Sequence, residues 1–494
     1  MAFPVLSADE AAALIPNGEV VGISGLTPAG APKAVPAAMA RRALAEHAAG
    51  REYRISLFSG GSNWREVDGA LSDADALAYR APFQSDPDLR AHINACDLDY
   101  CDMHLSALTQ NMRYGFLPRV RTAIVEVCEA TPDGELTLTT SSSNSAAFCR
   151  MADRIILELN AYHKPCLREL HDIYLPGDYA ERGPISISRP QDRIGTRTLK
   201  VDPAKIAGVV PTNQPDAVHP FRAVSELTHS IGRNIVGFLE QEYGAGRLPK
   251  ELPPFQSGIG NVANCVLAAM AESDVLPPFS MFTEVAQDTV YHLLKSGRCK
   301  FISSSTITFT EPLMQDFYAH FSDFKDRIIL RPAEISNNPE LIRRMGVISL
   351  NTALEADITG HVNSTHLFGR NMMNGIGGSC EFARAAALSI FSCPSTAKGG
   401  AISSIVPMVS HVDQVEHDVD VMVTEQGVAD LRGLSPRRRA ELIIGNCAHP
   451  DYRPLLRRYM ELTPTGHSPH SLEHGFCFHT AYLKTGDMRN AGLP

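Results

Sequence analysis

The chain has 494 residues, too many for one hydrophobic core, so we expect two or three domains. Hydrophobic residues make up 44% of the chain and charged residues 20%, a composition typical of a soluble globular protein. The net charge of −10 argues against non-specific nucleic-acid binding, which needs a basic surface. No run of about 18 apolar residues predicts a membrane span.

The cysteines and the N-terminus indicate the compartment. The chain has 11 cysteines, an odd number, and no CxxC pair, which favours reduced thiols over a disulfide framework or a zinc ribbon. The first residues, MAFPVLSADEAAALIPNGE, lack the basic start and apolar core of a secretory signal. We therefore predict a cytoplasmic protein.

Short apolar runs alternate with helical patterns in the first part of the chain. We predict strands at 20–25, 53–61 and 153–160, and an Ala-rich helix after the first of them. Residues 122–139 hold two β-rich runs around Pro132-Asp133-Gly134, which predicts a hairpin. Strands that alternate with helices predict an α/β fold with mostly parallel or mixed sheets.

A polar segment rich in Pro and Gly, 176–206, is the predicted linker, and the alternation restarts after it with a strand at 206–210. A strand, a glycine turn and a helix recur at 257–272. We therefore predict two α/β domains, 1–205 and 206–494. After this strand, the second domain continues with a helix over 221–243, whose apolar stripe is formed by Val224, Leu227, Ile231, Ile235, Phe238 and Leu239.

Residues 279–294, FSMFTEVAQDTVYHLL, place a carboxylate at the end of an apolar strand. A charge in such a place is costly unless it is paired or used, and Glu284 is therefore a candidate catalytic group. A second Thr-Glu pair, in VTEQ, puts Glu425 in a similar position. Either carboxylate can act as a covalent nucleophile. Glu425 can instead be an ion-pair partner, for example of Arg432.

Two glycine loops and a lysine are candidate ligand contacts. Gly258 and Gly260 precede a helix, where free amides can meet a ligand, although such a pair is often only a tight turn. The loop NGIGG, 374–378, is denser in glycine, which suits backbone amides that face a ligand or an oxyanion; the alternative is a surface turn. Lys398, before two glycines, can reach a phosphate or can be a solvated turn residue.

Other chemistries are less well supported. The cluster SHVDQVEHDVDV, 410–421, matches no metal-ligand spacing, and a polar turn explains it more simply. Cys380 can be a helix-start nucleophile, but a buried packing thiol is the simpler interpretation. Neither GxSxG nor GxxxxGK[ST] occurs, so serine hydrolases of the α/β type and P-loop NTPases are unsupported.

A set of motifs in order along nearly the whole chain resembles one family. The motifs include TPAGAPKAVP, HLSALTQNMRYGF, SGIGNVAN, FTEVAQD, LRPAEISNNPELIRRMG, NTALEADITGHVNSTH, NGIGGSCEFAR, the stretch from AKGGAISS to VTEQGVADLRGL, and IIGNCAHPDYR. Together they resemble the acetyl-CoA hydrolase/transferase family, a family of class I CoA-transferases. Within it, the motifs are most similar to those of bacterial succinyl-CoA:acetate CoA-transferases.

The resemblance implies two CoA-transferase-type α/β domains with the active site at their interface. It implies an enzyme that exchanges CoA between short acyl-CoA thioesters and carboxylic acids, such as succinyl-CoA and acetate. Glu284 would be the nucleophile of a ping-pong mechanism through an acyl-glutamyl anhydride and a glutamyl-CoA thioester. Coenzyme A enters as part of the substrate, and no metal is expected.

The resemblance also assigns the other site residues. It makes Gly260, Val262 and Gly378 the sources of oxyanion donors, and Asn337 and Glu425 the supporting polar residues. Contacts with CoA would be made by Ile259, Gly260, Asn261, Val262, Ala263, Asn374, Gly378 and Lys398. The family suggests a homodimer that acts on short-chain carboxylates, without a nucleic-acid or membrane partner.

Two departures from the family pattern concern specificity. Ala217 stands where an arginine often follows the aspartate, and Cys380-Glu381 replaces a more usual Gly-Asp. Three alternatives to succinyl-CoA:acetate exchange stay open: a propionyl-CoA:succinate CoA-transferase, an acetyl-CoA hydrolase, and a non-catalytic CoA-binding protein. The presence of Glu284 argues against the last. The sequence does not give the preferred acids or the direction of flux.

Overall fold

The computed structural model describes residues 3–218 and 225–494. They form two compact units, and each unit is assembled from segments that are separated in the sequence. The first unit comprises Met1–Pro220, Ser280–Met345 and Asn374–Gly378, and the second comprises Phe221–Phe279, Gly346–Met373 and Ser379–Pro494.

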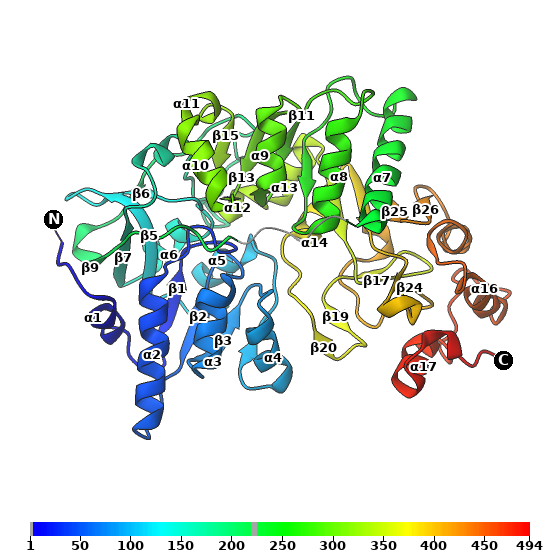
Figure 1. Cartoon of the computed structure of the whole chain (residues 1–494), viewed down its shortest axis with the longest axis horizontal. Helices are drawn as coiled ribbons and strands as arrows, with labels where there is room; N and C mark the ends of the chain where they lie inside the picture. Colours follow the sequence, from blue (N-terminus) through cyan, green and yellow to red (C-terminus); the bar gives the residue numbers. More distant parts are fainter. Residues whose placement is uncertain (1–2, 219–224) are drawn as a thin grey trace. The chain divides into compact units, whose positions relative to one another are not determined.

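The first unit contains a nine-stranded sheet from the N-terminal part of the chain (Figure 1). The strands run in the order β4-β3-β2-β1-β5-β6-β8, and β7 pairs with β5 and β9. They are β1 (Val20–Ile23), β2 (Ile55–Phe58), β3 (Leu77–Ala81), β4 (Asp99–Tyr100), β5 (Thr122–Ala130), β6 (Glu135–Leu138), β7 (Arg154–Asn160), β8 (Leu199–Lys200) and β9 (Ile206–Thr212).

The pairing confirms the predicted α/β fold with a mixed sheet. Strands β4, β3, β2, β1, β5, β7 and β9 pair with one another in parallel, in that order. Strand β6 is antiparallel to β5 and to β8. The predicted hairpin is present, because β5 and β6 pair across a turn closed by the Gly134 amide, which donates to Thr131 O at 3.0 Å.

Helices cover both faces of this sheet. They are α1 (Ala8–Ala13), α2 (Ala34–Ala48), α3 (Ala70–Asp73), α4 (Pro87–Ala95), α5 (Ala107–Arg113) and α6 (Ser145–Met151). Ile124 and Ile156 point into the core under α1 and α2, whereas Val125 and Leu157 point into the core under α5 and α6. This alternation is the period-two pattern of strands that are buried on both faces.

Residues 280–345 belong to the same unit, although they follow it by some 60 residues of chain. Their strands include β13, which pairs in parallel with β15, and β12, which pairs in parallel with β14. The elements are β11 (Phe279–Phe282), β12 (Val285–Gln287), α9 (Asp288–Lys295), β13 (Cys299–Ser304), β14 (Thr306–Thr308), α10 (Glu311–Ala319), α11 (Phe321–Phe324), β15 (Ile328–Leu330), α12 (Ala333–Ser336) and α13 (Pro339–Met345).

Backbone bridges join this segment to the N-terminal part of the unit. They link Ser141 with Thr306, Ser143 with Pro332, and His171 with Leu330. A buried ion pair between Arg331 and Asp172 adds to them. Because these contacts are backbone bonds and a compensated buried charge pair, they hold the segment in a defined register.

The predicted linker, 176–206, is wrong as a linker, because the segment packs on the first unit. Its residues Ile185 and Ile187 are buried, and the carbonyl of each accepts a hydrogen bond from Arg344. Strand β9, predicted to start the second domain, instead extends the first sheet beside β7. The predicted boundary between the two family domains, after residue 205, is not tested by this pairing and stays a prediction.

The second unit is built on the parallel strands β10, β16, β21 and β25, and β26 is antiparallel to β25. Its strands are β10 (Phe255–Ser257), β16 (Ile348–Thr352), β17 (Glu355–Asp357), β18 (Val362–Asn363), β19 (His366–Leu367), β20 (Asn371–Met372), β21 (Leu388–Ser392), β22 (Thr396–Ala397), β23 (Ile402–Ser403), β24 (Ile405–Val406), β25 (Val421–Thr424) and β26 (Gly427–Asp430). Its helices are α7 (Glu226–Gly244), α8 (Asn261–Glu272), α14 (Ser379–Ala385), α15 (Pro436–Leu442), α16 (Arg453–Glu461) and α17 (Cys477–Thr485).

Helices α7 and α8 pack side by side in this unit (Figure 1). The predicted apolar stripe of α7 is largely confirmed, because Ile231, Ile235, Phe238 and Leu239 are buried. Leu227 is only partly buried, and Val224, like the predicted helix start at 221, lies outside the described residues. A core of residues from β21, β25 and the last three helices completes the unit.

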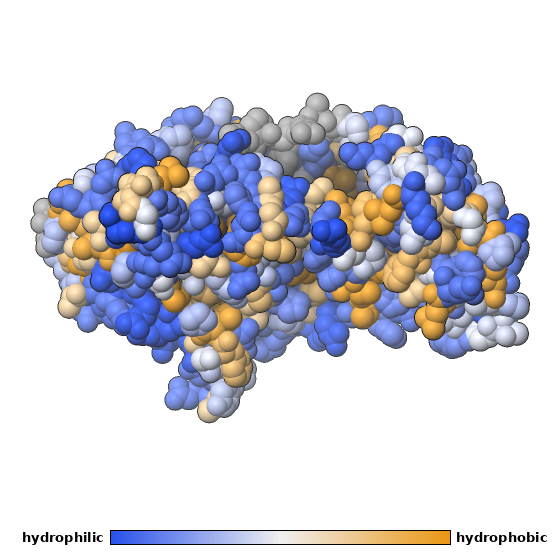
Figure 2. All heavy atoms as spheres, turned by 90° about the horizontal axis from the view of Figure 1, so that it is seen from below, coloured by the Kyte–Doolittle hydropathy of each residue, from blue (hydrophilic) through white to orange (hydrophobic). Residues whose placement is uncertain are grey.

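Figure 2 shows a face on which hydrophilic residues are interspersed with smaller hydrophobic areas. Exposed large apolar side chains include Phe116, Tyr179 and Leu472. Within 3–218 and 225–494, none of the helices combines the length and the apolar character needed to cross a membrane.

Candidate functional site

Glu284 lies directly after strand β11, in the short connection to β12. Its carbonyl accepts hydrogen bonds from the amides of Ser305 at 2.9 Å and Thr306 at 3.3 Å, and the preceding amide of Thr283 donates to Ser303 O at 2.9 Å. These bonds fix the backbone of Glu284 from both sides. The helix that follows, α9, packs an apolar face formed by Val290, Leu293 and Leu294 into the core.

The Glu284 carboxylate has two hydrogen-bond donors, and both belong to predicted site residues. Asn337 Nδ2 lies 3.0 Å from Glu284 Oε2. The backbone amide of Gly378 hydrogen-bonds to the same carboxylate. The structure therefore brings Glu284, Asn337 and Gly378 together, although 94 positions of sequence separate the first from the last (378 − 284).

Position 378 has no room for a side chain. A Cβ there would lie 2.3 Å from Glu284 Oε2 and 2.5 Å from Asn337 Nδ2. Contacts this short do not occur in real structures, so an alanine would displace the carboxylate, the amide or the loop. Glycine is required here because the backbone approaches a functional group closely, not because of a positive φ.

The surroundings of Glu284 raise its proton affinity. Burial raises the pKa of Glu284 to about 7, and the hydrogen bonds from Asn337 and from the Gly378 amide act in the opposite direction. The side chain still keeps some solvent-exposed surface. A carboxylate that is partly desolvated and still reachable is suited to attack a bound electrophile.

Asn337 is held by the segment that leads to it. Its side-chain carbonyl accepts from Ser336 Oγ at 2.7 Å, and its backbone amide donates to Ala333 O at 3.0 Å. One turn earlier, Glu334 forms an ion pair with Arg113 of α5. The amide of Asn337 is therefore oriented before any ligand arrives, which lowers the cost of using it.

The backbone amides of the glycine loop 374–378 were predicted to face a ligand or an oxyanion, but two of them bind other groups of the protein. The amide of Gly375 donates to Gln84 O at 2.8 Å, and the amide of Ile376 donates to the Asp102 carboxylate at 3.0 and 2.8 Å. Only the Gly378 amide, among these three, faces the proposed nucleophile. Asn374 is turned back on the loop, because its Nδ2 donates to Gly375 O at 3.0 Å.

Sequence reasoning missed Asp102. It stands in DLDYCD, where aspartates alternate with Leu, Tyr and Cys, and nothing in that pattern separates an aspartate that binds a backbone amide from a solvated turn residue. Its contact with Ile376 joins positions 274 residues apart. A pairing over that distance leaves no local signal in one sequence.

The other predicted contacts lie in the second unit. Gly260, with φ 120°, precedes α8, whose first residues are Asn261, Val262 and Ala263. The amides in the first turn of a helix have no acceptor within the helix, so they are available to an anion or an oxyanion. Ile259, beside them, has an exposed side chain.

Lys398 and Glu425 also belong to the second unit. Lys398 is exposed in a short helical turn between β22 and β23. Glu425 accepts from the Ser395 amide at 2.8 Å and from Gln426 Nε2 at 3.1 Å. Burial acts to raise the pKa of Glu425, but the bonds from Ser395 outweigh it, so the net pKa is lowered and the group is ionised.

The predicted alternative of a Glu425–Arg432 ion pair is wrong. The Arg432 guanidinium pairs with Asp430 at 2.7 Å and with Glu242 at 2.9 Å.

The comparisons with known proteins identify the family. A family model described as the acetyl-CoA hydrolase/transferase N-terminal domain matches residues 4–211, and the model of the C-terminal domain matches 314–460. The chain belongs to the acetyl-CoA hydrolase/transferase family. It is therefore an enzyme of a family whose substrates are thioesters of coenzyme A, and no metal cofactor is indicated for it.

Three relatives match over almost their whole length. The chain is similar to the propanoyl-CoA:succinate CoA transferase of Escherichia coli, at 48% identity over 98% of each chain. It is similar to the succinyl-CoA:acetate CoA-transferase of Clostridium kluyveri, at 46% identity over 98% of this chain and 90% of the other. It is also similar to the acetyl-CoA hydrolase of Schizosaccharomyces pombe, at 40% identity over 96% and 94%.

Solved structures share the fold at lower identity. RipA from Yersinia pestis superimposes with a TM-score of 0.70 at 20% identity, over 92% of this chain and 96% of that one. A 4-hydroxybutyrate CoA-transferase from Porphyromonas gingivalis gives a TM-score of 0.64 at 23% identity, over 93% and 97%. These likenesses show that the α/β architecture is the one found in CoA-transferases.

Cys380 is partly buried, and its contacts favour the interpretation as a packing thiol. Its Sγ lies 3.0 Å from Asp413 O, and Gln414 Nε2 donates to it. Burial raises the pKa of Cys380 to about 12, so the thiolate is scarce at neutral pH. Asp413 belongs to the cluster 410–421 that was considered as a metal site. Its carboxylate accepts hydrogen bonds from the amide of Ser364 at 2.6 Å and from the hydroxyl of Thr365 at 2.9 Å.

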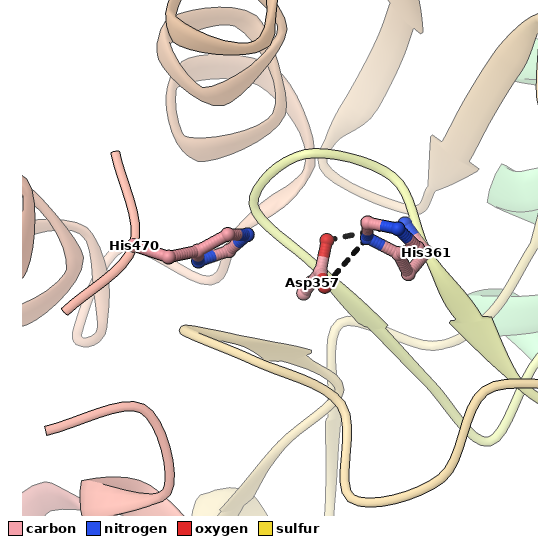
Figure 3. Close-up of side chains that lie close together, drawn as sticks. All are labelled: Asp357, His361 and His470. Atoms are coloured by element: carbon pink, nitrogen blue, oxygen red, sulfur yellow. Dashed lines mark hydrogen bonds and ion pairs between the residues drawn. The ribbon is translucent and has the colours of Figure 1, made fainter. Parts of the chain in front are cut away.

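A second group of possible metal ligands, Asp357, His361 and His470, is explained by its hydrogen bonds (Figure 3). Asp357 Oδ1 accepts from the amides of Thr359 and Gly360, both at 2.9 Å, and from that of His361 at 3.1 Å. Asp357 Oδ2 lies 3.1 Å from His361 Nδ1, and His470 Nε2 lies 3.3 Å from Thr359 Oγ1. The aspartate thus organises the turn after β17 without needing a metal.

The contact between His361 and Asp357 in this turn should make the stability of the protein depend on pH. The hydrogen bond with Asp357 raises the pKa of His361, so the folded state favours the imidazolium. That contribution is complete below the unfolded value of about 6.5 and is lost as the pH rises through the higher folded value. Replacing His361→Asn should cost roughly 0.5–1 kcal/mol at pH 6 and less at pH 9, as measured by urea unfolding.

The matched control is His417→Asn, because His417 is exposed in the short helical turn Glu416–Asp418 of the same unit. It should leave the free energy of unfolding unchanged at both pH values. A cost of His361→Asn that is equal at pH 6 and pH 9 would show that the ion pair does not contribute.

A further group, in the first unit, surrounds Lys33. The Lys33 ammonium lies 3.1 Å from Asp216 Oδ1 and also contacts Glu126, and His163 Nε2 lies 3.5 Å from Asp216 Oδ1. Burial acts to raise the pKa of Asp216, but the charges of Lys33 and His163 outweigh it and lower the net value. The ammonium already compensates the carboxylates, so the group is a buried ion network next to Ala217.

Proposed function

We propose that this protein is a CoA-transferase that exchanges CoA between short acyl-CoA thioesters and carboxylic acids, with succinyl-CoA plus acetate giving acetyl-CoA plus succinate as the reaction. One observation carries the proposal: the Glu284 carboxylate, held by Asn337 and the Gly378 amide, in a chain that is 46–48% identical to two CoA-transferases. A carboxylate nucleophile allows the exchange without a metal or a further cofactor.

The first half-reaction begins with Glu284. Its carboxylate oxygen attacks the thioester carbonyl, and the tetrahedral intermediate collapses by expelling the CoA thiolate. An acyl-glutamyl anhydride remains. The thiolate then attacks the glutamyl carbonyl of this anhydride, the carboxylate product leaves with its bonding electrons, and a glutamyl-CoA thioester is formed. The acceptor acid reverses both steps, which regenerates the Glu284 carboxylate.

Each of these steps passes through a tetrahedral oxyanion, which preorganised amides stabilise. We assign this role to the amides of Gly378, Gly260 and Val262. Asn337 orients the nucleophile, and Glu425 orients the reacting carboxylate. We assign the binding of CoA to Ile259 through Ala263, Asn374, Gly378 and Lys398. These roles, the placement of the site at the domain interface, the homodimer and the cytoplasmic location stay predictions.

The pKa of Glu284 gives a pH prediction. Because the attacking group is the carboxylate, kcat/KM for the acyl-CoA should rise with pH and level off above a midpoint near 7. The measurement is a pH profile of kcat/KM from pH 5.5 to 8.5 at constant ionic strength. A profile that is flat down to pH 5.5 would contradict an ionising nucleophile with a raised pKa.

A substrate panel tests the reaction itself. Acetyl-CoA, propionyl-CoA and succinyl-CoA are each offered with acetate, propionate or succinate, and the new acyl-CoA is measured. We expect a new acyl-CoA only when an acceptor acid is present. Ala217 and Cys380-Glu381 depart from the usual pattern, so the panel also decides which acids are preferred.

Acetyl-CoA hydrolysis is the second candidate, because a relative at 40% identity carries that name. In a hydrolase, water attacks the anhydride or the glutamyl thioester, so the outcome depends on how well the site excludes water. CoA release from acetyl-CoA at the same rate with and without succinate would favour the hydrolase and would contradict the transferase.

A further inference from the structure

The glycine loop beside Glu284 is seated on the ends of two parallel strands. Strands β3 and β4 pair with Tyr79 opposite Asp99 and Arg80 opposite Tyr100. The residues that follow them, 82–84 and 101–102, therefore emerge at the same edge of the sheet. This is the carboxyl edge, where ligand sites of open α/β sheets are found.

Asp102 emerges at this edge and holds the loop. Both of its carboxylate oxygens lie within hydrogen-bond distance of the Ile376 amide, Oδ2 at 2.8 Å and Oδ1 at 3.0 Å. Bonds from an amide to a carboxylate are stronger than bonds between neutral groups. A Cβ on Gly375 would lie 2.6 Å from Asp102 Oδ1, so the loop and the carboxylate are in direct contact.

The seat of the loop has two further contacts. Gly375 donates its amide to Gln84 O at 2.8 Å, and the Phe83 ring lies against Gly375 and Gly377. Tyr100 Oη lies 3.3 Å from Asp102 Oδ1 and donates a hydrogen bond to this carboxylate. Burial raises the pKa of Tyr100 well above its usual value, so this hydroxyl stays a donor.

The loop needs such a seat. It has three glycines in the five positions 374–378, and Gly377 adopts a positive φ of 60°. Glycine loses more conformational freedom than any other residue when it is fixed, so an unsupported loop of this composition would be poorly ordered. Ile376 is two residues before Gly378, and a shift of the Ile376 amide moves the Gly378 amide with it.

We propose that Asp102 is a positioning residue for the transfer reaction: by binding the Ile376 amide it holds the Gly378 amide against the Glu284 carboxylate. Asp102 acts through the loop, by its bonds to the Ile376 amide. The inference rests on the proposed function, and it adds the residue that sets the geometry of one oxyanion donor.

The test compares Asp102→Ala and Asp102→Asn with Asp99→Asn. Asp99 is exposed on β4, three residues before Asp102, and serves as the matched control. We expect Asp102→Ala to lower kcat about 10- to 100-fold, less than the 10²- to 10³-fold lost on removal of an oxyanion donor, because here the donor is only misplaced. KM for the acyl-CoA should change less than about threefold, and Asp102→Asn should have a smaller effect because its oxygen still accepts one bond.

Two readouts separate positioning from a merely structural role. The midpoint of the kcat/KM profile should move to higher pH in Asp102→Ala, because a misplaced Gly378 amide no longer favours the ionised Glu284. Hydrogen exchange of the peptide that contains Ile376 should be faster in Asp102→Asn than in the wild type, with unchanged exchange elsewhere in the first unit.

The outcomes distinguish this inference from the proposed function. If wild-type enzyme forms the glutamyl-CoA thioester and Asp102→Ala forms it at the same rate with the same pH midpoint, the inference is overturned and the function stands. If wild-type enzyme forms no such adduct, the function itself fails. Should Asp102→Ala not fold, Asp102→Asn decides: wild-type kcat together with wild-type exchange at Ile376 overturns the inference.

Discussion

Replacing Glu284→Gln should abolish CoA transfer, with a fall in kcat of about four orders of magnitude or more. The amide keeps the shape of the side chain and can still contact Asn337 and the Gly378 amide, but it has no carboxylate oxygen to attack the thioester. The measurement is the initial rate of acetyl-CoA formation from succinyl-CoA and acetate, with dialysed protein.

The variant should also be at least as stable as the wild type at pH 8. Burial raises the folded pKa of Glu284 to about 7 from an unfolded value near 4.5, so the favourable contribution of its protonated form is complete below pH 4.5 and is lost as the pH rises through 7. Over this pH range the free energy of unfolding of the wild type therefore falls by up to about 3 kcal/mol relative to that of the glutamine variant. Full activity in Glu284→Gln would show that Glu284 is not the nucleophile.

A control carboxylate is available on the same unit. Glu311, exposed at the start of α10, can be replaced by Gln without touching the site. This variant should keep wild-type activity. A comparable loss in Glu311→Gln would mean that the effect of Glu284→Gln does not report on the nucleophile.

Replacing Gly378→Ala should have the second largest effect, a fall in kcat of about 10²- to 10³-fold. The added methyl group would lie 2.3 Å from Glu284 Oε2 and 2.5 Å from Asn337 Nδ2, so the nucleophile, its orienting amide or the donor amide must move. Steady-state kinetics with acetyl-CoA and succinate measures the loss, and a thermal melt checks that the variant is folded.

Gly237→Ala is the matched control for this substitution. Gly237 lies within α7, and a Cβ there meets nothing within 4 Å. Alanine should stabilise the helix slightly and leave kcat unchanged. If Gly378→Ala retained wild-type kcat, the close contact of the Gly378 amide with Glu284 would have no catalytic role.

Local signals predicted much of the fold. The apolar runs at 20–25, 53–61 and 153–160 contain strands, and the Pro-Asp-Gly signal closes the predicted hairpin. The helix after Gly260 also lies where the apolar pattern places it. These features depend on neighbouring residues only, so a single sequence contains them.

Long-range pairing was not predictable. The return of residues 280–345 to the first unit depends on bridges such as Ser143 to Pro332, and the burial of Ile185 and Ile187 made the expected linker part of that unit. Such pairings join residues far apart in the chain and leave no local periodicity.

The same division holds at the site. Glu284 became one of two candidate carboxylates because it is a charge at the end of an apolar strand, and the resemblance to the family made it the nucleophile. The density of glycines marked the loop that contains Gly378. Asp102 has neither an unusual setting nor an unusual spacing, and only the structure places it against the loop. The assignments of Gly260, Lys398 and Glu425 rest on the resemblance to the family.

The covalent intermediate is the most direct test of the central claim. The enzyme is incubated with succinyl-CoA or acetyl-CoA, treated with borohydride, digested and examined by mass spectrometry. We predict a reduced glutamyl residue in the peptide that contains Glu284, formed only with acyl-CoA and absent from Glu284→Gln. An unmodified Glu284 in enzyme that is turning over, or a modification at Cys380 instead, would contradict the mechanism.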